Sequence, residues 1–186
     1  GKEVSDWDFT TDAKPEEILK IFPEAFYDNK FGTVGIPVKH LPGVNTIPPD
    51  HLEGEVLEIT TMRREGDYKD FRHPTEVGWT NNIEEDLARR DFTINALALD
   101  AEGHLIDPYH GQEDIKTKII ETVGDPNKRF KEDALRLMRA VRIAAEVGFE
   151  IEPKTFQAIC QNRELIEEVA FERIRDELLK ILASSN

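Results

Sequence analysis

The first hundred or so residues contain four short runs rich in β-branched and aromatic residues, a pattern that predicts β-strands. The runs are VSDWDFTT (residues 4–11), TVGIPVKHL (33–41), HLEGEVLEITTM (51–62) and FTINALALD (92–100). Helical patterns here are short and cover residues 14–22, with Pro15 in the first turn, and residues 83–89. This mixture predicts a small mixed or antiparallel sheet flanked by helices.

Three connections between these elements stand out. LPGVNTIPPD (residues 41–50) contains three prolines, one glycine and one asparagine, which predicts a hairpin connection or an inserted loop. AEGH (101–104) predicts the turn of a second hairpin. REGDYKDFRHP (64–74) mixes charges with Gly66 and lacks an apolar period. It is either a loop that closes over a substrate or a connector without function.

From Asp125 onward the pattern changes to helix. Apolar residues recur at helical spacing from Asp125 and Pro126 to Gly148, which predicts one long helix over this segment. Pro153 is expected to open a shorter helix, and residues 171–182 are expected to form another. The second part of the chain is therefore predicted to be entirely helical.

The expected fold class is α+β, with a mixed head over residues 1–124 and an all-helical neck over residues 125–186. The chain has 186 residues, of which 39% are hydrophobic, enough for one core or one core with a helical extension. No stretch approaches the roughly 20 apolar residues of a membrane helix, and the first residues lack the apolar centre of a signal peptide. These features predict a cytoplasmic protein that makes no contact with membranes.

Composition limits the ligands that this chain is expected to bind. The net charge is −14, and RNA binding draws much of its affinity from Lys and Arg, so the chain alone is expected to bind RNA weakly. Clustered arginines nevertheless suit a small polyanionic ligand; they stand at positions 63 and 64, 89 and 90, and 136, 139 and 142. The single cysteine, Cys160, excludes an internal disulfide, and the five histidines show no metal-ligand spacing.

Two aspartates one residue apart, Asp6 and Asp8, are the first candidate site residues. In an extended segment they share one face, while Trp7 and Phe9 point into packing on the other. Carboxylates held this close repel one another unless a cation lies between them, and oxygen ligands favour Mg²⁺ over zinc. Such ligands hold the ions of a two-metal phosphoryl-transfer site. The alternative is a surface strand with two solvated acids.

Glu58 is the third candidate acid. Leu57 and Ile59 are expected to face the opposite side of its strand, which leaves Glu58 on the polar face. It is expected either to complete the metal site or to orient an attacking hydroxyl. A solvent-facing glutamate without function is the equal alternative.

RRDFTINA (residues 89–96) is the most specific string in the sequence. The guanidinium groups of Arg89 and Arg90 suit triphosphate oxygens, which they can bind with two hydrogen bonds each. Asp91 is expected to fix an arginine or a ribose hydroxyl, and Asn95 to lie on the same face of the following strand. The alternative is an ion-paired helix end that leads into a buried strand.

EDALRLMRAVR (residues 132–142) spaces one acid and three arginines at intervals of three residues: Asp133, Arg136, Arg139 and Arg142. On a continuous helix they form one stripe. An aspartate beside an arginine offers acceptors and donors in a fixed plane, so this pair is predicted to recognise a base edge in place of a nucleic-acid template. The alternative is a salt bridge on a solvated helix face.

These segments together resemble the class II tRNA nucleotidyltransferase family, which includes CCA-adding enzymes and bacterial poly(A) polymerases. The resemblance covers nearly the whole chain and rests on five motifs in the family's order. SDWDFTT resembles the catalytic Asp-X-Asp motif, and REGDYKDFRHP resembles the flexible loop. EEDLARRDFTINALALD resembles the ribose and triphosphate motif, EDALRLMRAVR the nucleotide-selecting helix, and FERIRDELLKIL the closing neck helix.

The resemblance implies a polymerase-β-like nucleotidyltransferase head with a helical neck, and a Mg²⁺ cofactor. The implied partners are CTP, ATP and the 3′ end of tRNA, whose hydroxyl would attack the α-phosphate and release pyrophosphate. By the same likeness Asp6 and Asp8 bind Mg²⁺ and Arg90 meets the nucleotide. The residues implied in choosing C and A are Asp133 and Arg136, supported by Arg139 and Arg142.

The chain also departs from the family pattern. The glycine-rich GGxVRD segment that precedes the catalytic strand in the family, and the body and tail that hold tRNA, are missing from this sequence. We therefore expect a head and partial neck, with the loop and tail supplied by a second chain or further segments. An A-adding enzyme, a poly(A) polymerase and a nucleotide-binding module without catalysis stay open as alternatives. Use of CTP separates CCA addition from the A-only rivals.

Overall fold

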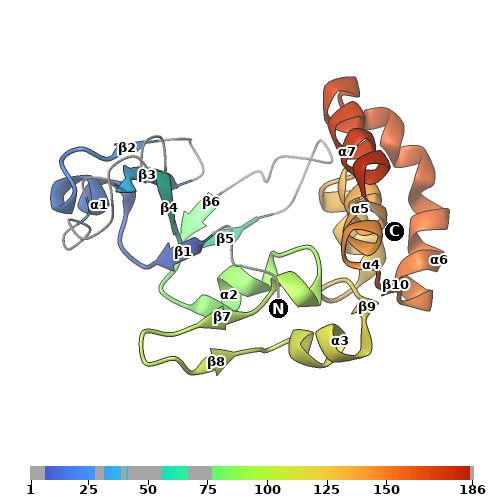
Figure 1. Ribbon diagram of the computed structural model, residues 1–186, viewed down its shortest axis with the longest axis horizontal. Helices are drawn as coiled ribbons and strands as arrows, with labels where there is room; N and C mark the ends of the chain where they lie inside the picture. Colours follow the sequence, from blue (N-terminus) through green and yellow to red (C-terminus); the bar gives the residue numbers. More distant parts are fainter. Residues whose placement is uncertain (1–6, 28–31, 39–40, 42–55, 67–76, 185–186) are drawn as a thin grey trace. The chain divides into compact units, whose positions relative to one another are not determined.

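The computed structural model of the chain describes residues 7–27, 32–38, 41, 56–66 and 77–184. The chain divides into two compact units, whose elements are labelled in Figure 1. The first unit comprises Gly1–Arg64 and Val77–Ile83, and the second comprises Glu65–Glu76 and Glu84–Asn186. Of the predicted loops at 41–50 and 64–74, only Leu41 and residues 64–66 belong to the described residues.

A four-stranded sheet forms the centre of the first unit. In Figure 1 its strands follow the order β1-β4-β3-β2, with bounds Asp8–Thr11, Val56–Thr61, Thr33–Pro37 and Phe26–Tyr27. β1 and β4 run parallel, whereas the other two pairs are antiparallel, so the predicted mixed sheet is confirmed. The predicted helix after β1 is also present as α1, Pro15–Ile21, whose first turn contains Pro15.

One face of this sheet carries the hydrophobic core of the first unit. Val34 and Ile36 are fully buried there against Ile18 of α1, and Leu57 and Ile59 pack around them. The alternation predicted for residues 57–59 of β4 is therefore confirmed, because Leu57 and Ile59 face the core while Glu58 between them faces the other side.

The predicted packing of Trp7 and Phe9 is wrong. The two rings stack on one another with centroids 6.4 Å apart, but the residues are 62% and 43% exposed. Among the described residues, β1 has a neighbouring strand on one side only. An edge strand offers its side chains fewer neighbours, which explains why these aromatic rings are not buried.

The second unit begins with short elements. After α2 (Ile83–Ala88) come the 3-10 turn η4 (Thr93–Asn95), the strands β7 (Ala98–Leu99) and β8 (Leu105–Ile106), α3 (Gly111–Thr117) and β9 (Ile119–Ile120). β7 and β8 are antiparallel. The helix predicted over residues 83–89 and the second hairpin are therefore confirmed. In the first unit, a further two-stranded sheet pairs β5 (Arg63–Glu65), whose last residue is at the boundary with the second unit, with β6 (Val77–Trp79).

The strand predicted over residues 92–100 is wrong in its first half. Phe92 pairs with Thr122 in an isolated bridge, and the chain then turns through η4. Phe92 is fully buried, and the N–H of Thr93 donates to the Glu121 carbonyl at 2.9 Å. The Thr93 hydroxyl donates to the Asp114 carboxylate at 2.6 Å. These tertiary contacts outweigh the β-propensity of the segment.

The predicted long helix from Asp125 to Gly148 is also wrong. The segment forms α4 (Pro126–Glu132) and α5 (Arg136–Val147), and Asp133 between them is extended, with φ −138° and ψ 107°. The Asp133 carboxylate accepts the N–H of Leu135 at 3.1 Å. Short polar side chains that bond nearby backbone in this way favour helix starts over helix interiors, which explains the break.

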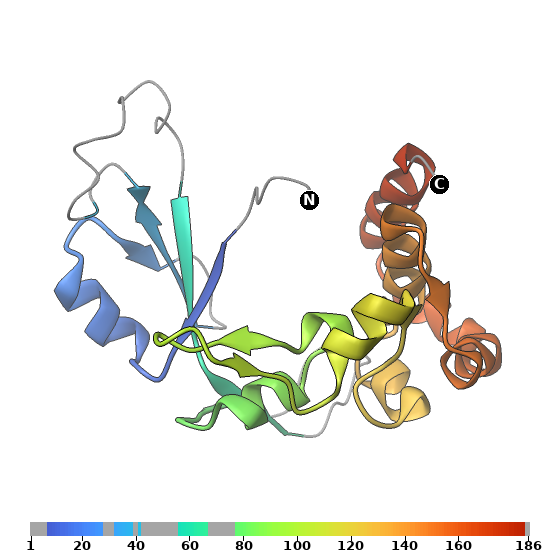
Figure 2. The ribbon, with the colours of Figure 1, turned by 60° about the horizontal axis from the view of Figure 1, so that its bottom comes forward.

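The remaining helices follow the prediction. α6 (Pro153–Asn162) begins at Pro153, and α7 (Phe171–Ala183) covers the segment expected to be helical. Between them lies η5 (Arg163–Glu168). The prediction that residues 125–186 are entirely helical is wrong at β10 (Glu150–Ile151), because the chain after Gly148 forms backbone hydrogen bonds with β9. Figures 1 and 2 show α7 alongside α5, with α6 alongside α4. The α+β class is confirmed. No helix in the described part of the chain is long and apolar enough to cross a membrane.

The core of the second unit joins its short elements to α5. Phe92 and Ile120 are fully buried against Ala140 and Ile143 of α5. A neighbouring cluster connects α4, α5 and α6 and consists of Phe130, Leu137 and Ala158. The residues beside Phe92 are consequently held against α5.

Gly111 supports this arrangement, because a Cβ at that position would lie 2.1 Å from the carbonyl oxygen of Thr93. We expect Gly111→Ala to lower the free energy of unfolding by about 1–3 kcal/mol, since only a shift of the η4 backbone relieves the clash. Chemical denaturation measures the change. Gly78→Ala is the control, because its Cβ would meet only the flexible Arg64 side chain, at 3.1 Å. Equal losses in both variants would contradict this explanation.

Candidate active site

Asp8 and Glu58 lie opposite one another on neighbouring strands. The parallel register of β1 and β4 pairs the two residues, so their side chains project from the same face of the sheet. This is the face opposite the one that packs on α1, and both residues are exposed. The other predicted aspartate, Asp6, lies outside the described residues.

Threonines occupy the next row of the same face. The hydroxyl of Thr10 donates to the Thr60 carbonyl at 3.0 Å, and the hydroxyls of Thr33 and Thr60 lie 3.2 Å apart. These bonds cross from β1 to β4 and from β3 to β4. They therefore hold the two acid-bearing strands in register, and the strand pairing fixes which carboxylates are neighbours.

The exposed acids of this face fit a hard divalent cation. Asp8 and Glu58 each offer carboxylate oxygens, the ligands that Mg²⁺ and Ca²⁺ prefer. Adjacent carboxylates also repel one another, and a cation between them would remove that repulsion. The donor chemistry therefore agrees with the predicted metal site.

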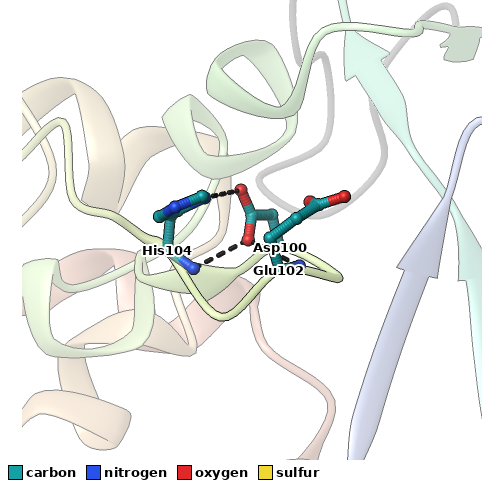
Figure 3. A group of neighbouring side chains, drawn as sticks. All are labelled: Asp100, Glu102 and His104. Atoms are coloured by element: carbon teal, nitrogen blue, oxygen red, sulfur yellow. Dashed lines mark hydrogen bonds and ion pairs between the residues drawn. The ribbon is translucent and has the colours of Figure 1, made fainter.

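A second group of possible ligands lies in the turn of the β7–β8 hairpin, where the side chains of Asp100, Glu102 and His104 lie close together (Figure 3). The Asp100 carboxylate accepts the backbone N–H groups of Glu102 and His104 at 3.0 and 2.7 Å, and lies 2.9 Å from His104 Nδ1. The bond from the His104 N–H is the main reason why the pKa of Asp100 is lowered. The turn's own hydrogen bonds thus account for this group.

Arg89 and Arg90 both contact the buried Asp86 at the end of α2. Nε and Nη2 of Arg89 donate to Asp86 Oδ1 at 3.0 and 2.8 Å, and Arg90 Nη2 lies 3.6 Å from Oδ2. The Arg89 side chain is 16% exposed, whereas that of Arg90 is 34% exposed. Arg90 therefore has more surface to offer a ligand than Arg89.

Asp91 is a buried carboxylate whose two oxygens accept four hydrogen bonds or ion-pair contacts. Oδ1 accepts from the Asn95 amide at 3.0 Å and from the Phe92 N–H at 2.9 Å. Oδ2 contacts Nε and Nη2 of Arg139 at 2.7 and 2.6 Å. Asn95 therefore lies beside Asp91 as predicted, although η4 rather than a pleated strand brings them together.

Burial alone would raise the pKa of Asp91. The charge of Arg139 and the bonds from Asn95, Arg139 and Phe92 together outweigh burial, so the pKa lies below its ordinary value. The pKa of Arg139 is raised by the same pair against the opposing effect of burial. Both groups are therefore charged, and the pair joins the segment after α2 to α5.

Arg136 is nearly buried at the start of α5. Its Nη1 donates to the Arg129 carbonyl at 3.2 Å and to Glu132 at 2.8 Å, and its Nη2 donates to the Arg89 carbonyl at 3.0 Å. These bonds use three of the five N–H groups that an arginine offers. Arg136 thus fixes α4 and the end of α2 to α5.

The predicted stripe of four residues is wrong for Asp133, which lies outside α5. Its second carboxylate oxygen is 3.3 Å from Nη2 of Arg173 in α7. Arg142 lies in the middle of α5. Its Nη1 contacts Oε2 of Glu146 at 2.9 Å, and its Nε lies 2.7 Å from Oε2 of Glu177 in α7. Asp133 and Arg142, the first and last residues of the predicted stripe, therefore both contact α7.

Sequence reasoning missed the partners of these residues. Asp86, Glu132 and Glu146 each stand three or four residues from an arginine, which is the spacing of neighbouring side chains on a helix. This spacing can be read from the sequence alone. Arg173 and Glu177 gave no local signal, because their partners Asp133 and Arg142 are distant in the sequence.

Two family models match the sequence. The model of the poly A polymerase head domain matches residues 1–121. A model described as the probable RNA- and SrmB-binding site of polymerase A matches residues 148–186. The first match covers Asp8, Glu58 and the segment from Arg89 to Asn95.

Relatives with curated names and solved structures agree with these matches. The CCA-adding enzyme of Geobacillus stearothermophilus is 44% identical over 182 residues, 98% of this chain and 42% of the relative. A crystal structure of the Bacillus stearothermophilus CCA-adding enzyme in complex with CTP has a TM-score of 0.83 at 39% identity, covering 99% of this chain and 41% of that one. For a Thermotoga maritima CCA-adding enzyme complexed with tRNA_CCA, the TM-score is 0.71 at 27% identity, with coverages of 99% and 40%. The chain therefore spans less than half the length of these relatives.

The pair of Asp91 and Arg139 predicts a pH-dependent stability. Because the folded-state pKa of Asp91 lies below the unfolded value of about 3.9, the pair stabilises the protein fully above that value. Its contribution is lost as the pH falls through the lower folded-state pKa. We expect Asp91→Asn to be about 2 kcal/mol less stable than wild type at pH 7, with a smaller difference near pH 3. Urea unfolding at both pH values measures this, and an undiminished difference at pH 3 would contradict an ionic contact.

Proposed function

The chain belongs to the family of the poly A polymerase head domain, and on that premise we propose that it acts as a tRNA nucleotidyltransferase. The proposed reaction adds CMP and AMP from CTP and ATP to the 3′ end of tRNA without a template. The observation that carries the proposal is the in-register pair of Asp8 and Glu58 on an exposed face. Relatives named CCA-adding enzymes, with structures in complex with CTP and with tRNA, support the choice of substrates.

We assign the catalytic head to residues 1–124 and the nucleotide-selecting neck to residues 125–186. The end of the head-domain match at residue 121 supports this boundary. The second compact unit, Glu84–Asn186 with Glu65–Glu76, crosses the boundary because Phe92 and Ile120 pack on α5. The boundary therefore separates two proposed roles and not two hydrophobic cores.

Nucleotidyltransferases typically need a divalent metal ion, and we assign its ligands to Asp6, Asp8 and Glu58, with Mg²⁺ as the ion. Bound there, the ion would stabilise negative charge on the triphosphate and on the attacking oxygen. Glu58 has a second possible role, which is to orient the 3′ hydroxyl of tRNA. In the reaction that oxygen bonds to the α-phosphorus, and the hydroxyl releases its proton to solvent. The bond between the α-phosphorus and the oxygen that bridges to the β-phosphate breaks, and pyrophosphate leaves.

The triphosphate is assigned to Arg90, with Arg89, Asp91 and Asn95 holding the segment that presents it. Arg90 is the more exposed of the two arginines beside Asp86, and a guanidinium binds phosphate oxygens with two parallel bonds. The buried carboxylate of Asp91 restrains Arg139, Asn95 and the backbone of Phe92. Positioning of this kind accounts for much of the catalysis in phosphoryl transfer.

Base selection is assigned to Asp133 and Arg136, with support from Arg139 and Arg142. Cytosine and adenine present an amino donor at the position where uracil and guanine present a carbonyl oxygen. A carboxylate accepts a hydrogen bond from the amino group and repels the carbonyl, so Asp133 would favour C and A. Arg136 would supply donors through the N–H groups that its three internal bonds do not use.

A second candidate is an A-adding enzyme or poly(A) polymerase, which the description of the matching head domain favours. The head chemistry is the same in both candidates, so the metal ligands do not separate them. Addition of C does, because an A-only enzyme would not use CTP.

The deciding experiment measures incorporation of labelled CTP, ATP or both onto tRNA that lacks its CCA end, with Mg²⁺. Because the relatives are longer, the assay is run on this chain and on the longest protein that contains it. We expect C to be added before A. Addition of A alone would establish the A-only candidate, and nucleotide binding without incorporation in either protein would establish a module without catalysis.

Asp8→Ala and Glu58→Ala test the proposed ligands. We expect each to reduce incorporation by more than about a hundredfold, since loss of a direct ligand should exceed the effect of losing a residue behind it. The fold should be retained, because both side chains are exposed and neighbouring like charges are relieved. Asp12→Ala is the control, an exposed aspartate just after β1. Wild-type rates in Asp8→Ala would remove the metal assignment.

A further inference from the structure

Helix α7 supplies two side chains, one turn apart, to residues of the proposed base-selecting region. Arg173 Nη2 lies 3.3 Å from Oδ2 of Asp133, and Glu177 Oε2 lies 2.7 Å from Nε of Arg142. Arg173 and Glu177 are four residues apart, so they share one face of α7. α7 packs against α5, and Glu177 on this face contacts Arg142 of α5.

The direction of the Asp133 carboxylate depends on one of these contacts. Asp133 is the extended residue that follows α4. Its N–H donates to the Arg129 carbonyl, but its side chain belongs to neither helix. Its Oδ1 accepts the N–H of Leu135 at 3.1 Å, and its Oδ2 contacts Arg173. Each oxygen is therefore held by a different group, and loss of Arg173 would leave the carboxylate held through Oδ1 by the Leu135 N–H.

Glu177 places a negative charge beside Arg142 of α5. Its side chain is 8% exposed and its partner Arg142 is 15% exposed, so the pair is largely removed from solvent. The charges of Glu177 and Asp133 also help raise the pKa of Arg139, after the larger effects of burial and Asp91. α7 is thus in electrostatic contact with Asp133, Arg139 and Arg142.

We propose that Arg173 is a positioning residue for base selection, which holds Asp133 so that its carboxylate meets the amino group of C or A. Glu177 has the parallel task of holding Arg142. The inference rests on the proposed function, because Asp133 is assigned to base recognition there. A purely structural Arg173 would instead tie α7 to α5 and affect all nucleotides equally.

The α7 helix contains its own control. Arg175 is two residues from Arg173, but its side chain is 54% exposed and contacts its neighbour Asp176 at 2.8 Å. Arg175→Ala therefore removes the same chemical group from the same helix without touching Asp133. The test compares Arg173→Ala, Arg173→Lys and Arg175→Ala in the longest protein that contains this chain.

The readout is discrimination between CTP and UTP, measured as the ratio of kcat/KM values and, without tRNA, as the ratio of Kd values. We expect Arg173→Ala to lower both ratios about tenfold, the effect of losing a hydrogen bond to a charged group. Arg173→Lys should recover part of the loss, because one ammonium can still contact Oδ2. Arg175→Ala should retain the wild-type ratios.

Each outcome decides the inference. Unchanged ratios in Arg173→Ala, or equal loss of rate with CTP and UTP, would overturn it in favour of a structural tie. If Arg173→Ala does not fold, as judged by thermal unfolding, Arg173→Gln and Arg173→Lys decide by the same ratios. If wild type incorporates nothing, the proposed transfer fails, while the Kd ratios still test Arg173. A wild-type protein that binds CTP and UTP equally would overturn the inference.

Discussion

The contact between Asp91 and Arg139 is the constraint on which the second unit depends. A carboxylate removed from water costs free energy unless hydrogen bonds and an opposite charge compensate it. Asp91 obtains both, from Arg139 and from its neighbours Phe92 and Asn95. Because the partners come from the turn after α2 and from α5, the pair can form only when those elements are packed together. The buried Phe92 cluster beside it makes that packing favourable.

Compensation by opposite charges also explains how a chain of net charge −14 holds several arginines close together. Asp86 contacts Arg89 and Arg90, and Glu132 contacts Arg129 and Arg136. Most of the positive charge is therefore compensated inside the unit. A ligand would meet guanidinium groups whose direction is already fixed, which reduces the entropy lost on binding. Preorganisation, more than excess charge, is what the second unit offers a nucleotide.

In the first unit, the sheet holds two like charges close together. Hydrogen bonds between β1 and β4 place Asp8 beside Glu58, and α1 packs only on the opposite face. Leu57 and Ile59 of β4 pack on that opposite face, so their burial keeps the acids in water. Mutual repulsion is thus offset by the strand pairing and the core, and the acids stay available to a cation.

The sequence by itself determined which side of β4 faces the core and where several helices begin or end. Period-2 alternation placed Glu58 opposite Leu57 and Ile59, and the positions of Pro15, Asp125, Pro153 and Gly148 marked helix boundaries, because these effects act over a few residues. Asp133 breaks the following helix through a local bond to the Leu135 N–H, whereas only the tertiary structure decided that residues 93–95 form a turn. It also decided that α7 supplies partners to Asp133 and Arg142. Those outcomes depend on contacts between residues distant in sequence, whose energies outweigh local propensity and leave no local pattern.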